Sequence, residues 1–281
     1  MSHLHSLNEA MEYIESHLDQ KIDMKEVARK ALSSEYEFKR IFSFLSGMTL
    51  SDYIRKRRLT LAAMALQKGG AKVIDVANQY GYSSPDAFSR AFERYHHILP
   101  SEVRTRTHTL KSCPIMTFRL TIEGGEEMNY RIEEKTEFKV AGYCMEMIME
   151  ENQLKPSYDE VLEKLTDERV EELTDLSDRE PSGVIHVTTD YRQLSEHTEA
   201  FNHYIGAAVS KDYSGNKETH DIKASAWAVF EIEGDWESVE KEWMRIYSEW
   251  LPSSNFELIE GAEILASKEN SSEVWIQVKK R

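Results

Sequence analysis

The sequence has few cysteines and no long hydrophobic run, and each absence excludes a class of protein. Only Cys113 and Cys144 occur among the 281 residues, too few for a disulfide scaffold or a four-cysteine zinc site, so we expect both to be reduced. No apolar run approaches the ~20 residues that a membrane helix needs, and the first residues lack the basic and apolar segments of a secretory signal. We therefore expect a cytoplasmic protein that does not contact a membrane.

Motifs that hold cofactors or metals are also missing. Gly69-Gly70 and Gly124-Gly125 lack the surrounding pattern of a phosphate loop and are typical of turns. Residues 212–218 resemble a calcium loop only superficially, because its glycine and closing glutamate are misplaced, and we expect a polar hairpin turn there. The ten histidines show no metal-ligand spacing on a helix. The sequence thus predicts no cofactor, no metal and no catalytic residue.

What the sequence does contain is an uneven distribution of charge. A length of 281 residues suits two domains of ~150 residues, and 40% hydrophobic with 30% charged residues is ordinary for a soluble protein. Residues 1–111 carry 17 Lys and Arg against 13 Asp and Glu, which leaves 18 against 37 for the remainder and a formal charge of -15 overall. We expect the two halves to have different partners.

Residues 7–97 show helical periodicity almost throughout, and the pattern contains an internal repeat. A short helix and a helix over residues 38–45 precede a long helix over 51–68, whose ~18 residues span about 27 Å. A short helix over residues 73–80 and another over 85–95 then repeat the order. Any three-helix bundle can mimic one helix-turn-helix unit, whereas two such units joined by a long helix are much more specific.

Beyond Pro100 the pattern becomes typical of an α+β domain. Strands are expected where β-branched or alternating residues gather, and helices where the spacing is helical. The expected strands are 115–122, 138–149, 183–189, 224–232 and 274–278, and the expected helices are 158–173 and 236–250. Residues 140–143 and 225–228 are similar and precede the two helices, which indicates two pseudo-symmetric strand-helix-strand-strand halves. The acidic run 166–180 is expected to end a helix and continue as a solvated loop.

Several motifs of the helical part occur in a characteristic order. They are Leu32-Ser33-Ser34-Glu35-Tyr36-Glu37-Phe38-Lys39-Arg40-Ile41-Phe42, Gly47, Tyr53-Ile54-Arg55 and Arg58-Leu59, then Ile74, Val76-Ala77, Tyr80-Gly81-Tyr82, Phe88-Ser89-Arg90-Ala91-Phe92, Pro100 and Arg104. Over about residues 5–107 they resemble the DNA-binding domain of the AraC/XylS family. We therefore predict an all-α double helix-turn-helix domain at residues 1–107.

This resemblance implies two recognition helices that enter adjacent major-groove segments on one face of double-stranded DNA, about 34 Å apart, with the long helix as the spacer. In the first helix Tyr36, Lys39 and Arg40 take the base-facing positions. Lys and Arg can donate to guanine O6 and N7, and a tyrosine can contact a thymine methyl group. In the second helix Arg90 is the candidate, and weaker readout is expected because residues 85–87 replace longer polar groups.

The basic run of the long helix has two interpretations. Arg55-Lys56-Arg57 can add contacts to DNA phosphates, or it can form a solvated helix face paired with Asp52 or Glu102. Arg58 is expected to have a structural role. The sequence leaves both interpretations of the run open.

The second region carries a different set of motifs. They are Met128-Asn129-Tyr130-Arg131-Ile132, Phe138-Lys139-Val140-Ala141-Gly142, Tyr204-Ile205-Gly206, Trp227-Ala228-Val229-Phe230-Glu231-Ile232-Glu233-Gly234 and Glu249-Trp250-Leu251-Pro252-Ser253. In this order they resemble the GyrI-like effector-binding domain, which we place at residues 128–281, with residues 108–127 as a linker and first strand. The implied fold has two halves around a central cleft that binds bulky aromatic or cationic small molecules.

Aromatic side chains are the candidates for lining that cleft, because their flat faces stack on flat ligands and attract cations. The candidates are Tyr143, Phe201, Tyr204, Trp227 and Trp275. The same residues also suit a hydrophobic core, and the sequence does not separate the two roles. The effector is expected to be a small aromatic molecule.

One departure from the family pattern concerns the charge of the cleft. Leu265 stands where the family carries a glutamate that neutralises cationic ligands, and Ser267 stands where it carries a tyrosine. Glu263 is two residues earlier and so lies on the same face of a strand; it either substitutes for the missing carboxylate or is a surface residue. With Leu265 in the cleft, a preference for neutral or weakly charged aromatic ligands over lipophilic cations is expected.

The two resemblances together predict a one-component transcriptional regulator, whose DNA binding changes when a small molecule binds. Family habit favours an activator over a repressor, and RNA polymerase is then a candidate partner. Two other interpretations remain. The second domain can be a hydrolase of reactive small molecules, which the absence of the glutamate at Leu265 weakens, or a module that sequesters toxic molecules without affecting DNA.

Overall fold

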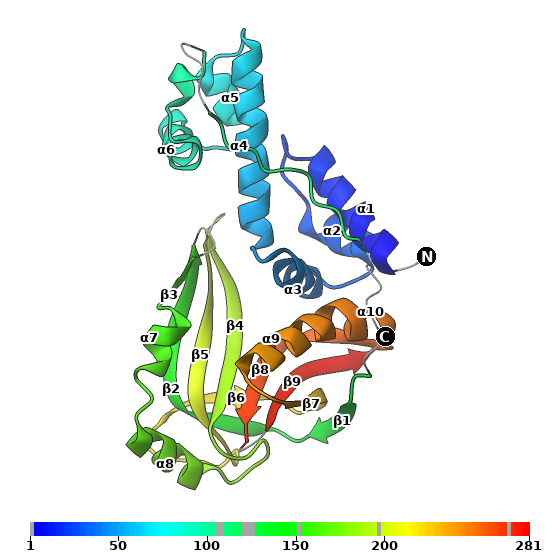
Figure 1. Cartoon of the computed structure of the whole chain (residues 1–281), viewed down its shortest axis with the longest axis vertical. Helices are drawn as coiled ribbons and strands as arrows, with labels where there is room; N and C mark the ends of the chain where they lie inside the picture. The colour runs from blue at the N-terminus through cyan, green and yellow to red at the C-terminus, as the bar shows by residue number, and fades with distance from the viewer. Residues whose placement is uncertain (1–2, 105–108, 120–126, 151–152, 196–197, 269–270) are drawn as a thin grey trace. The chain divides into compact units, whose positions relative to one another are not determined.

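The computed structural model describes residues 3–104, 109–119, 127–150, 153–195, 198–268 and 271–281. The chain divides into two compact units, unit 1 at Met1–Thr121 and unit 2 at Ile122–Arg281 (Figure 1). In the described part of the chain, no helix has the length and apolar character needed to cross a membrane. Neither Cys113 nor Cys144 forms a disulfide.

Unit 1 is helical, as predicted. Its elements are α1 (His3–Ser16), α2 (Met24–Ala31), α3 (Glu35–Ser46), α4 (Leu50–Lys68), α5 (Val73–Gln79), α6 (Pro85–His96) and the short 3₁₀ helix η1 (Pro100–Glu102). Local residues fix where the helices begin: the side chains of Ser34, Thr49 and Ser84 accept hydrogen bonds from the backbone N–H groups in the first turns of α3, α4 and α6. Gly47 ends α3 in the left-handed conformation.

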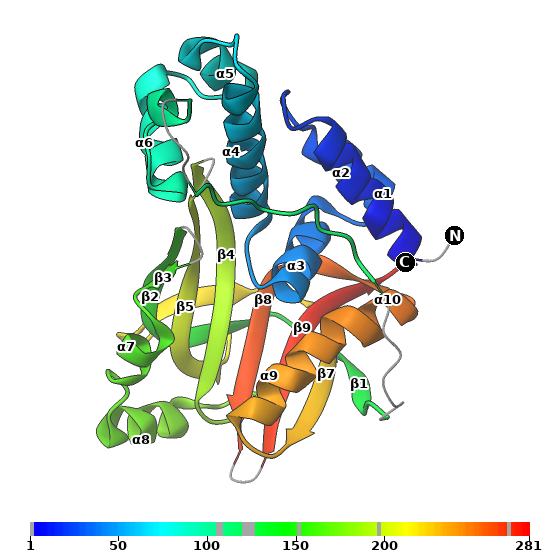
Figure 2. The same ribbon diagram turned by 45° about the horizontal axis from the view of Figure 1, so that its top comes forward.

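The long helix α4 carries one helix-turn-helix unit near each of its ends. Figures 1 and 2 both show α3 near the first turn of α4, and α5 and α6 beside its last turns. The second helix-turn-helix, formed by α5 and α6, packs on α4 through a hydrophobic cluster that includes Leu59, Leu66, Phe88 and Phe92. With 19 residues, α4 is about 28 Å long, and the internal repeat predicted from the sequence is confirmed in this arrangement.

The described residues 109–119 differ from the expected linker and strand. They form no strand, and polar groups of the helices bind their backbone instead. The N–H of Cys113 donates to Oγ1 of Thr60 at 2.9 Å, the N–H of Met116 donates to Oη of Tyr53 at 3.1 Å, and Asn8 makes two hydrogen bonds with the backbone of Phe118. These bonds hold the segment in unit 1. The rest of the expected strand, residues 120–122, lies outside the described residues.

Unit 2 is an α+β domain. Its strands are β1 (Tyr130–Lys135), β2 (Phe138–Glu150), β3 (Gln153–Lys155), β4 (Ile185–Ser195), β5 (Thr198–Val209), β6 (Glu218–Ile222), β7 (Ser225–Glu233), β8 (Phe256–Ser267) and β9 (Ser271–Lys280). Its helices are α7 (Tyr158–Leu162), α8 (Asp167–Leu176), α9 (Trp236–Arg245), the π-helix η2 (Ile246–Trp250) and α10 (Leu251–Ser253).

The strands pair antiparallel in one sheet of order β1-β7-β9-β8-β4-β5-β2-β3, and β6 pairs with β2. The first half contributes β2, then α7 and α8, then β4 and β5, and the second half contributes β7, then α9, then β8 and β9. The halves meet where β4 pairs with β8, with Ile185 opposite Ala266. The predicted duplication of a strand-helix-strand-strand unit is confirmed.

The acidic segment before β4 forms two helices where one was expected. A single helix was predicted over 158–173, but α7 ends at Leu162, and α8 begins after Thr166, whose Oγ1 accepts from the N–H of Arg169. The run 166–180 does end a helix, as predicted, but that helix is the separate α8, and it continues to Leu176, three residues beyond the expected end. A threonine cap and acidic residues in the first turn favour the start of a new helix after Thr166.

Alternate residues of each strand face opposite sides of the sheet. On one side, Met147 of β2 and Phe201 of β5 pack against Val161 of α7 and Leu173 of α8. On the other side, Val140 and Tyr204 belong to a larger core. Figures 1 and 2 show α7 and α8 beside β2 and α9 along β8 and β9.

The sheet curls around the side that the helices do not cover. Phe138 of β2 and Trp227 of β7 belong to strands that are far apart in the sheet order, yet their ring centroids lie 6.4 Å apart. Trp275 of β9 packs against Trp227 at 6.3 Å. Within the described residues, this inner side is therefore filled by a hydrophobic core.

Candidate functional site

The first recognition helix presents its predicted residues on one face. Lys39 and Arg40 follow Tyr36 on α3 by three and four residues, which places both beside the tyrosine on the helix surface. All three are partly exposed, whereas Phe38, Ile41 and Phe42 of the same helix are buried. The guanidinium of Arg40 lies 4.7 Å from the ring centroid of Phe44. The exposed face of α3 thus carries two cations and an aromatic ring.

The second recognition helix presents fewer polar groups. Arg90 of α6 is exposed, and Phe88 and Phe92 on either side of it are buried. Pro85 occupies the first turn of α6, next to the exposed Asp86. Arg90 and Lys39 make no ion pair within the described part of unit 1, so their charges are available to a ligand.

The arginines of the basic run of α4 are buried, and the expectation of phosphate contacts by Arg55 is corrected. Nη2 of Arg55 lies 2.6 Å from Oδ1 of Asp52, and the side chains of Arg55 and Asp52 are 6% and 2% exposed. Nζ of Lys56 lies 2.6 Å from the other oxygen of the same carboxylate, Oδ2, with 24% of its side chain exposed. The predicted pairing with Asp52 is confirmed, but within the protein rather than on a solvated face.

Arg57 and Arg58 are buried in the same way. Arg57 donates to both carboxylate oxygens of Glu15 and, at 2.6 Å, to the carbonyl of Cys113. Burial lowers the pKa of Arg57, but the hydrogen bonds and charge of Glu15 outweigh burial, so its pKa lies above the ordinary value. Arg58 donates to the carbonyls of Leu18 and Gln20, as expected of a structural residue. Contact of Arg57 with the DNA backbone is therefore corrected as well.

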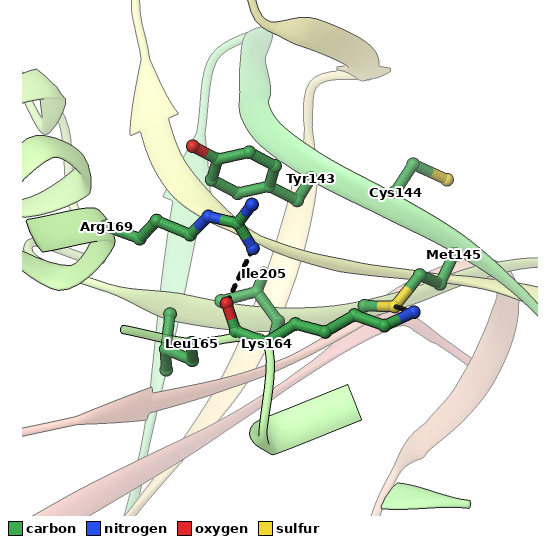
Figure 3. Close-up of a pocket in the computed structure, with 7 residues that line it drawn as sticks. All are labelled: Tyr143, Cys144, Met145, Lys164, Leu165, Arg169 and Ile205. Atoms are coloured by element: carbon green, nitrogen blue, oxygen red, sulfur yellow. Dashed lines mark hydrogen bonds between the residues drawn. The ribbon is translucent and has the colours of Figure 1, made fainter. Parts of the chain in front are cut away.

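Unit 2 holds a pocket of about 220 Å³ on the helix side of the sheet (Figure 3). Its charged lining residues are Lys164, between α7 and α8, and Arg169 of α8. Tyr143 of β2 forms the aromatic wall, and Ile205 of β5 lies directly opposite Tyr143 in the sheet. Met145, Leu165 and Cys144 complete the lining. The pocket therefore combines an apolar floor with two cations.

The two central strands approach closely beside this pocket because glycines face each other. Gly142 of β2 pairs with Gly206 of β5. A Cβ atom added to either glycine would overlap the backbone of the opposite strand. The residues that follow and precede this pair, Tyr143 and Ile205, are thereby held at the pocket wall.

Tyr143 is already in contact with cations of the chain itself. The guanidinium of Arg169 lies 4.5 Å from the ring centroid, and Figure 3 shows it between Tyr143 and Ile205. Nζ of Lys217 lies 4.2 Å from the same centroid and 2.7 Å from Oη of Tyr143. Arg169 also donates to the carbonyl of Lys164 at 2.6 Å. The aromatic wall thus faces positive charge before any ligand enters.

The carboxylate of Glu172 lies beside these cations and is bound to Lys217. Glu172 accepts from Nζ of Lys217 at 2.7 Å and from Oη of Tyr143 at 2.9 Å. The hydrogen bonds from Lys217 and Tyr143 hold the pKa of Glu172 below its usual value. Among the described residues Lys164 and Arg169 form no ion pair, and the ammonium of Lys164 lies 3.8 Å from the thioether sulfur of Met145.

The other predicted cleft aromatics belong to hydrophobic cores. Phe201 is on the helix side but packs with Met147 and Leu173. Tyr204, Trp227 and Trp275 are on the inner side, 4%, 0% and 1% exposed. The prediction that these three line a ligand cleft is wrong, because the curled sheet encloses them. Tyr143 is the one predicted aromatic residue that lines the described pocket.

Glu263 is a buried residue of β8, not a surface carboxylate. It is 4% exposed, and Oη of Tyr247 donates to its Oε1 at 2.8 Å. Leu265 follows on the same side of the strand, opposite His186 of β4. Glu263 is not among the residues that line the pocket. No cation of the pocket is therefore matched by this carboxylate.

The pocket cations were not predicted from the sequence. Lys164, Arg169 and Lys217 lie in or next to segments rich in Asp and Glu, where positive charge is expected to pair. Thr166, which caps α8, was the one local signal, because it starts the helix that carries Arg169. No spacing rule brings Lys217, 48 residues later, to the same ring.

Comparison with known families agrees with both units. The model of the GyrI-like small molecule binding domain matches residues 128–279, and a helix-turn-helix domain model matches residues 27–106. Regulatory protein SoxS of Escherichia coli strain K12 is 38% identical over 106 residues, which are 38% of this chain and 99% of SoxS. Probable transcription factor PqrA of Proteus vulgaris is 33% identical over 114 residues, 38% of this chain and 93% of PqrA.

Two solved structures are each similar to a part of the chain. An AraC-type regulator from Chromobacterium violaceum is 25% identical over 36% of this chain and 89% of its own, with a TM-score of 0.34. The protein SAV2435 bound to tetraphenylphosphonium is 14% identical over 54% of this chain and 94% of its own, with a TM-score of 0.45.

Proposed function

We propose a function from one premise: the chain belongs to the AraC family of DNA-binding transcription regulators, and its second unit belongs to the GyrI-like family of small-molecule-binding domains. The proposal is that unit 1 binds DNA sites that α3 and α6 read and activates transcription from them. An aromatic effector bound in unit 2 changes the affinity of unit 1 for these sites. The observation that carries it is the pairing of exposed cations on two recognition helices with a separate, half-enclosed pocket in the other unit.

In the proposed complex, α3 reads bases and α6 reads fewer of them. Arg40 and Lys39 donate to guanine in one major-groove segment, and Tyr36 contacts a thymine methyl group. Arg90 of α6 donates to guanine in the next major-groove segment. The residues Arg55 and Arg57 take no part, because Asp52 and Glu15 hold their guanidinium groups inside unit 1. Lys56, with a quarter of its side chain exposed, keeps the predicted phosphate contact.

The test of DNA binding is a footprint of the full chain on a duplex selected from random sequence. The proposal expects protection of two adjacent major-groove segments on one face of the duplex. The logarithm of the affinity is expected to fall linearly with the logarithm of the salt concentration, because cations on the protein displace counterions from DNA. Protection of a single half-turn would contradict docking by both helices.

The pocket of unit 2 supports an effector other than a lipophilic cation. A cation that leaves water for an apolar site loses hydration, and contact with an aromatic ring returns only ~0.5–2 kcal/mol. Here Arg169 and Lys217 already contact the ring of Tyr143. Glu172, the carboxylate beside that ring, is bound to Lys217. We therefore propose neutral or weakly charged aromatic effectors.

The effector is tested by screening the full chain against a panel of aromatic compounds of all three charge types. Binders raise the unfolding temperature, since a ligand that binds the folded state stabilises it. Each binder is then titrated against the chain with its selected duplex. A panel in which no compound changes the affinity for DNA would reject the effector role and leave DNA binding intact. Transcription with purified RNA polymerase separates activation from repression.

A further inference from the structure

We propose that the pocket beside Tyr143 is an anion site, and that its ligand is a flat aromatic monocarboxylate whose carboxylate binds Arg169 and Lys164. This inference rests on the proposed effector role of unit 2 and, among the neutral and singly charged aromatic effectors proposed above, selects the anions. It assigns a ligand to two cations that make no ion pair within the described residues of unit 2.

The first step of the argument is the charge of the lining. The charged residues that line the pocket are Lys164 and Arg169, both positive. A third cation, Lys217, lies against the same tyrosine ring, and its partner is Glu172. Three cations therefore lie around the pocket against one carboxylate, Glu172, which also interacts electrostatically with Arg169. An anion is the ligand that restores neutrality.

The second step is the hydrogen-bonding capacity of Arg169. A guanidinium has five N–H donors in a planar fork. One described hydrogen bond of Arg169 goes to the carbonyl of Lys164, from Nη1 at 2.6 Å. That bond fixes the guanidinium at the pocket, and N–H groups remain for a carboxylate. Because a carboxylate matches the fork of arginine with two parallel hydrogen bonds, it is preferred over a spherical anion.

The third step concerns Lys164. Its side chain extends along the pocket toward Met145, as Figure 3 shows, and its ammonium lies 3.8 Å from the sulfur of that residue. A thioether is a weak acceptor, so this contact does not satisfy three ammonium donors. A ligand carboxylate between Lys164 and Arg169 gains a second charged partner without displacing an existing ion pair.

The fourth step is the shape and polarity of the rest of the site. Tyr143, Met145, Leu165 and Ile205 offer apolar surface around the cations. The guanidinium of Arg169 lies 4.5 Å from the Tyr143 centroid and occupies the space between that ring and Ile205. A flat ring can enter beside it and stack on the guanidinium or on Tyr143. The site thus favours an aromatic acid over an aliphatic one.

The acidic character of unit 2 does not oppose this ligand strongly. The region beyond residue 111 holds 18 basic and 37 acidic residues. At physiological ionic strength, exposed charges more than ~8–10 Å apart are largely screened. The local pair of cations therefore decides which sign of charge binds. High salt is expected to weaken the binding of an aromatic carboxylate at this pocket.

The test is calorimetry of the full chain with three ligands that share one ring system. These are 2-naphthoate, the neutral 2-naphthamide and the cation 2-naphthyl-trimethylammonium. We expect naphthoate to bind at least tenfold more tightly than the amide, and the cation to bind most weakly of the three. Arg169→Met and Lys164→Met should each weaken naphthoate by about ten- to a hundredfold, since a hydrogen bond to a charged group is lost, and leave the amide nearly unchanged.

Lys211→Met is the matched control. It removes a cation from the same unit that is paired with Glu137 at 2.8 Å and 59% exposed, so naphthoate affinity should not change. The proposal is overturned if naphthoate binds no tighter than the amide, if the cation binds tightest, or if naphthoate affinity survives both substitutions. Tight binding of the amide with no preference for naphthoate would reject the anion site and leave the effector role standing.

Discussion

The cations of α4 in unit 1 and those around Tyr143 in unit 2 differ in their partners. Arg55 and Arg57 are buried and bound to Asp52 and Glu15. In the described part of unit 2, Lys164 and Arg169 make no ion pair, although that unit has far more acidic residues. Availability to a ligand therefore depends on the local carboxylates and not on the net charge of the region. A dense basic run can be a structural device, and two isolated cations can form a binding site.

The largest effect is expected from breaking the buried network of unit 1. Asp52→Ala removes the carboxylate that binds Arg55 and Lys56. Losing one partner of a buried ion pair costs ~3–5 kcal/mol of folding free energy. Urea denaturation of the full chain measures this loss as a lower unfolding midpoint for unit 1. Glu93→Ala, which removes an exposed carboxylate of α6, should change the stability by less than ~0.5 kcal/mol; an equal loss in both variants would contradict a structural role for the pair.

A buried histidine gives unit 2 the steeper dependence on pH. Burial, together with His186, lowers the pKa of His203 to about 4, whereas an unfolded histidine titrates near ~6.5. Between these pH values the unfolded state binds more protons than the folded state. The free energy of unfolding of unit 2 therefore falls by up to ~3 kcal/mol as the pH falls from 6.5 to 4, and this contribution is fully present above pH 6.5. Burial also lowers the pKa of His96 in unit 1.

Denaturation at pH 7 and pH 4.5 checks this prediction. His203→Gln keeps a polar side chain of similar size without the titrating ring, so its stability should fall less with acid than that of the parent chain. His17→Gln is the control, because His17 of unit 1 is only partly buried and its side chain hydrogen-bonds only to neighbours within four residues. A pH dependence that is identical in the His203 variant and the parent would show that another group governs acid unfolding.

Substitutions on α3 and α4 separate residues that read bases from residues that stabilise unit 1, and their expected effects are smaller than that of Asp52→Ala. Arg40→Ala should cost ~1–3 kcal/mol on the selected duplex and relax the preference at one base pair. Lys39→Ala should behave similarly. Arg57→Ala, in contrast, should lower the stability of unit 1 through the loss of the Glu15 pair. Equal loss of affinity on selected and random DNA for Arg40→Ala would remove Arg40 from the readout.

The sequence predicted the helices of unit 1 well, because their signals are local. Ser34, Thr49 and Ser84 cap the helices that the periodicity indicates, and Gly47 ends one of them. The burial of Arg57 was missed, since it depends on contacts with Glu15 and Cys113, 42 and 56 residues away in sequence. Helical spacing alone does not tell a solvated basic face from one covered by another segment.

Unit 2 was less predictable because its faces depend on the curvature of the sheet. Alternation places Trp227 and Trp275 on strands, but only the contact between β2 and β7 shows that their side of the sheet is closed. The pocket at Tyr143 assembles residues from β2, β5 and the region of α7 and α8. No short-range sequence pattern indicates that these elements come together, and for that reason Lys164 and Arg169 were not predicted.

The central claim is that a ligand in unit 2 changes the affinity of unit 1 for DNA. The most direct measurement is the Kd of the full chain for its selected duplex, without ligand and with the tightest binder of the aromatic panel at saturation. The account predicts a change of at least about fivefold and, because linkage is reciprocal, the same factor in ligand affinity when DNA is present. A Kd for DNA that stays the same at saturating ligand would contradict it.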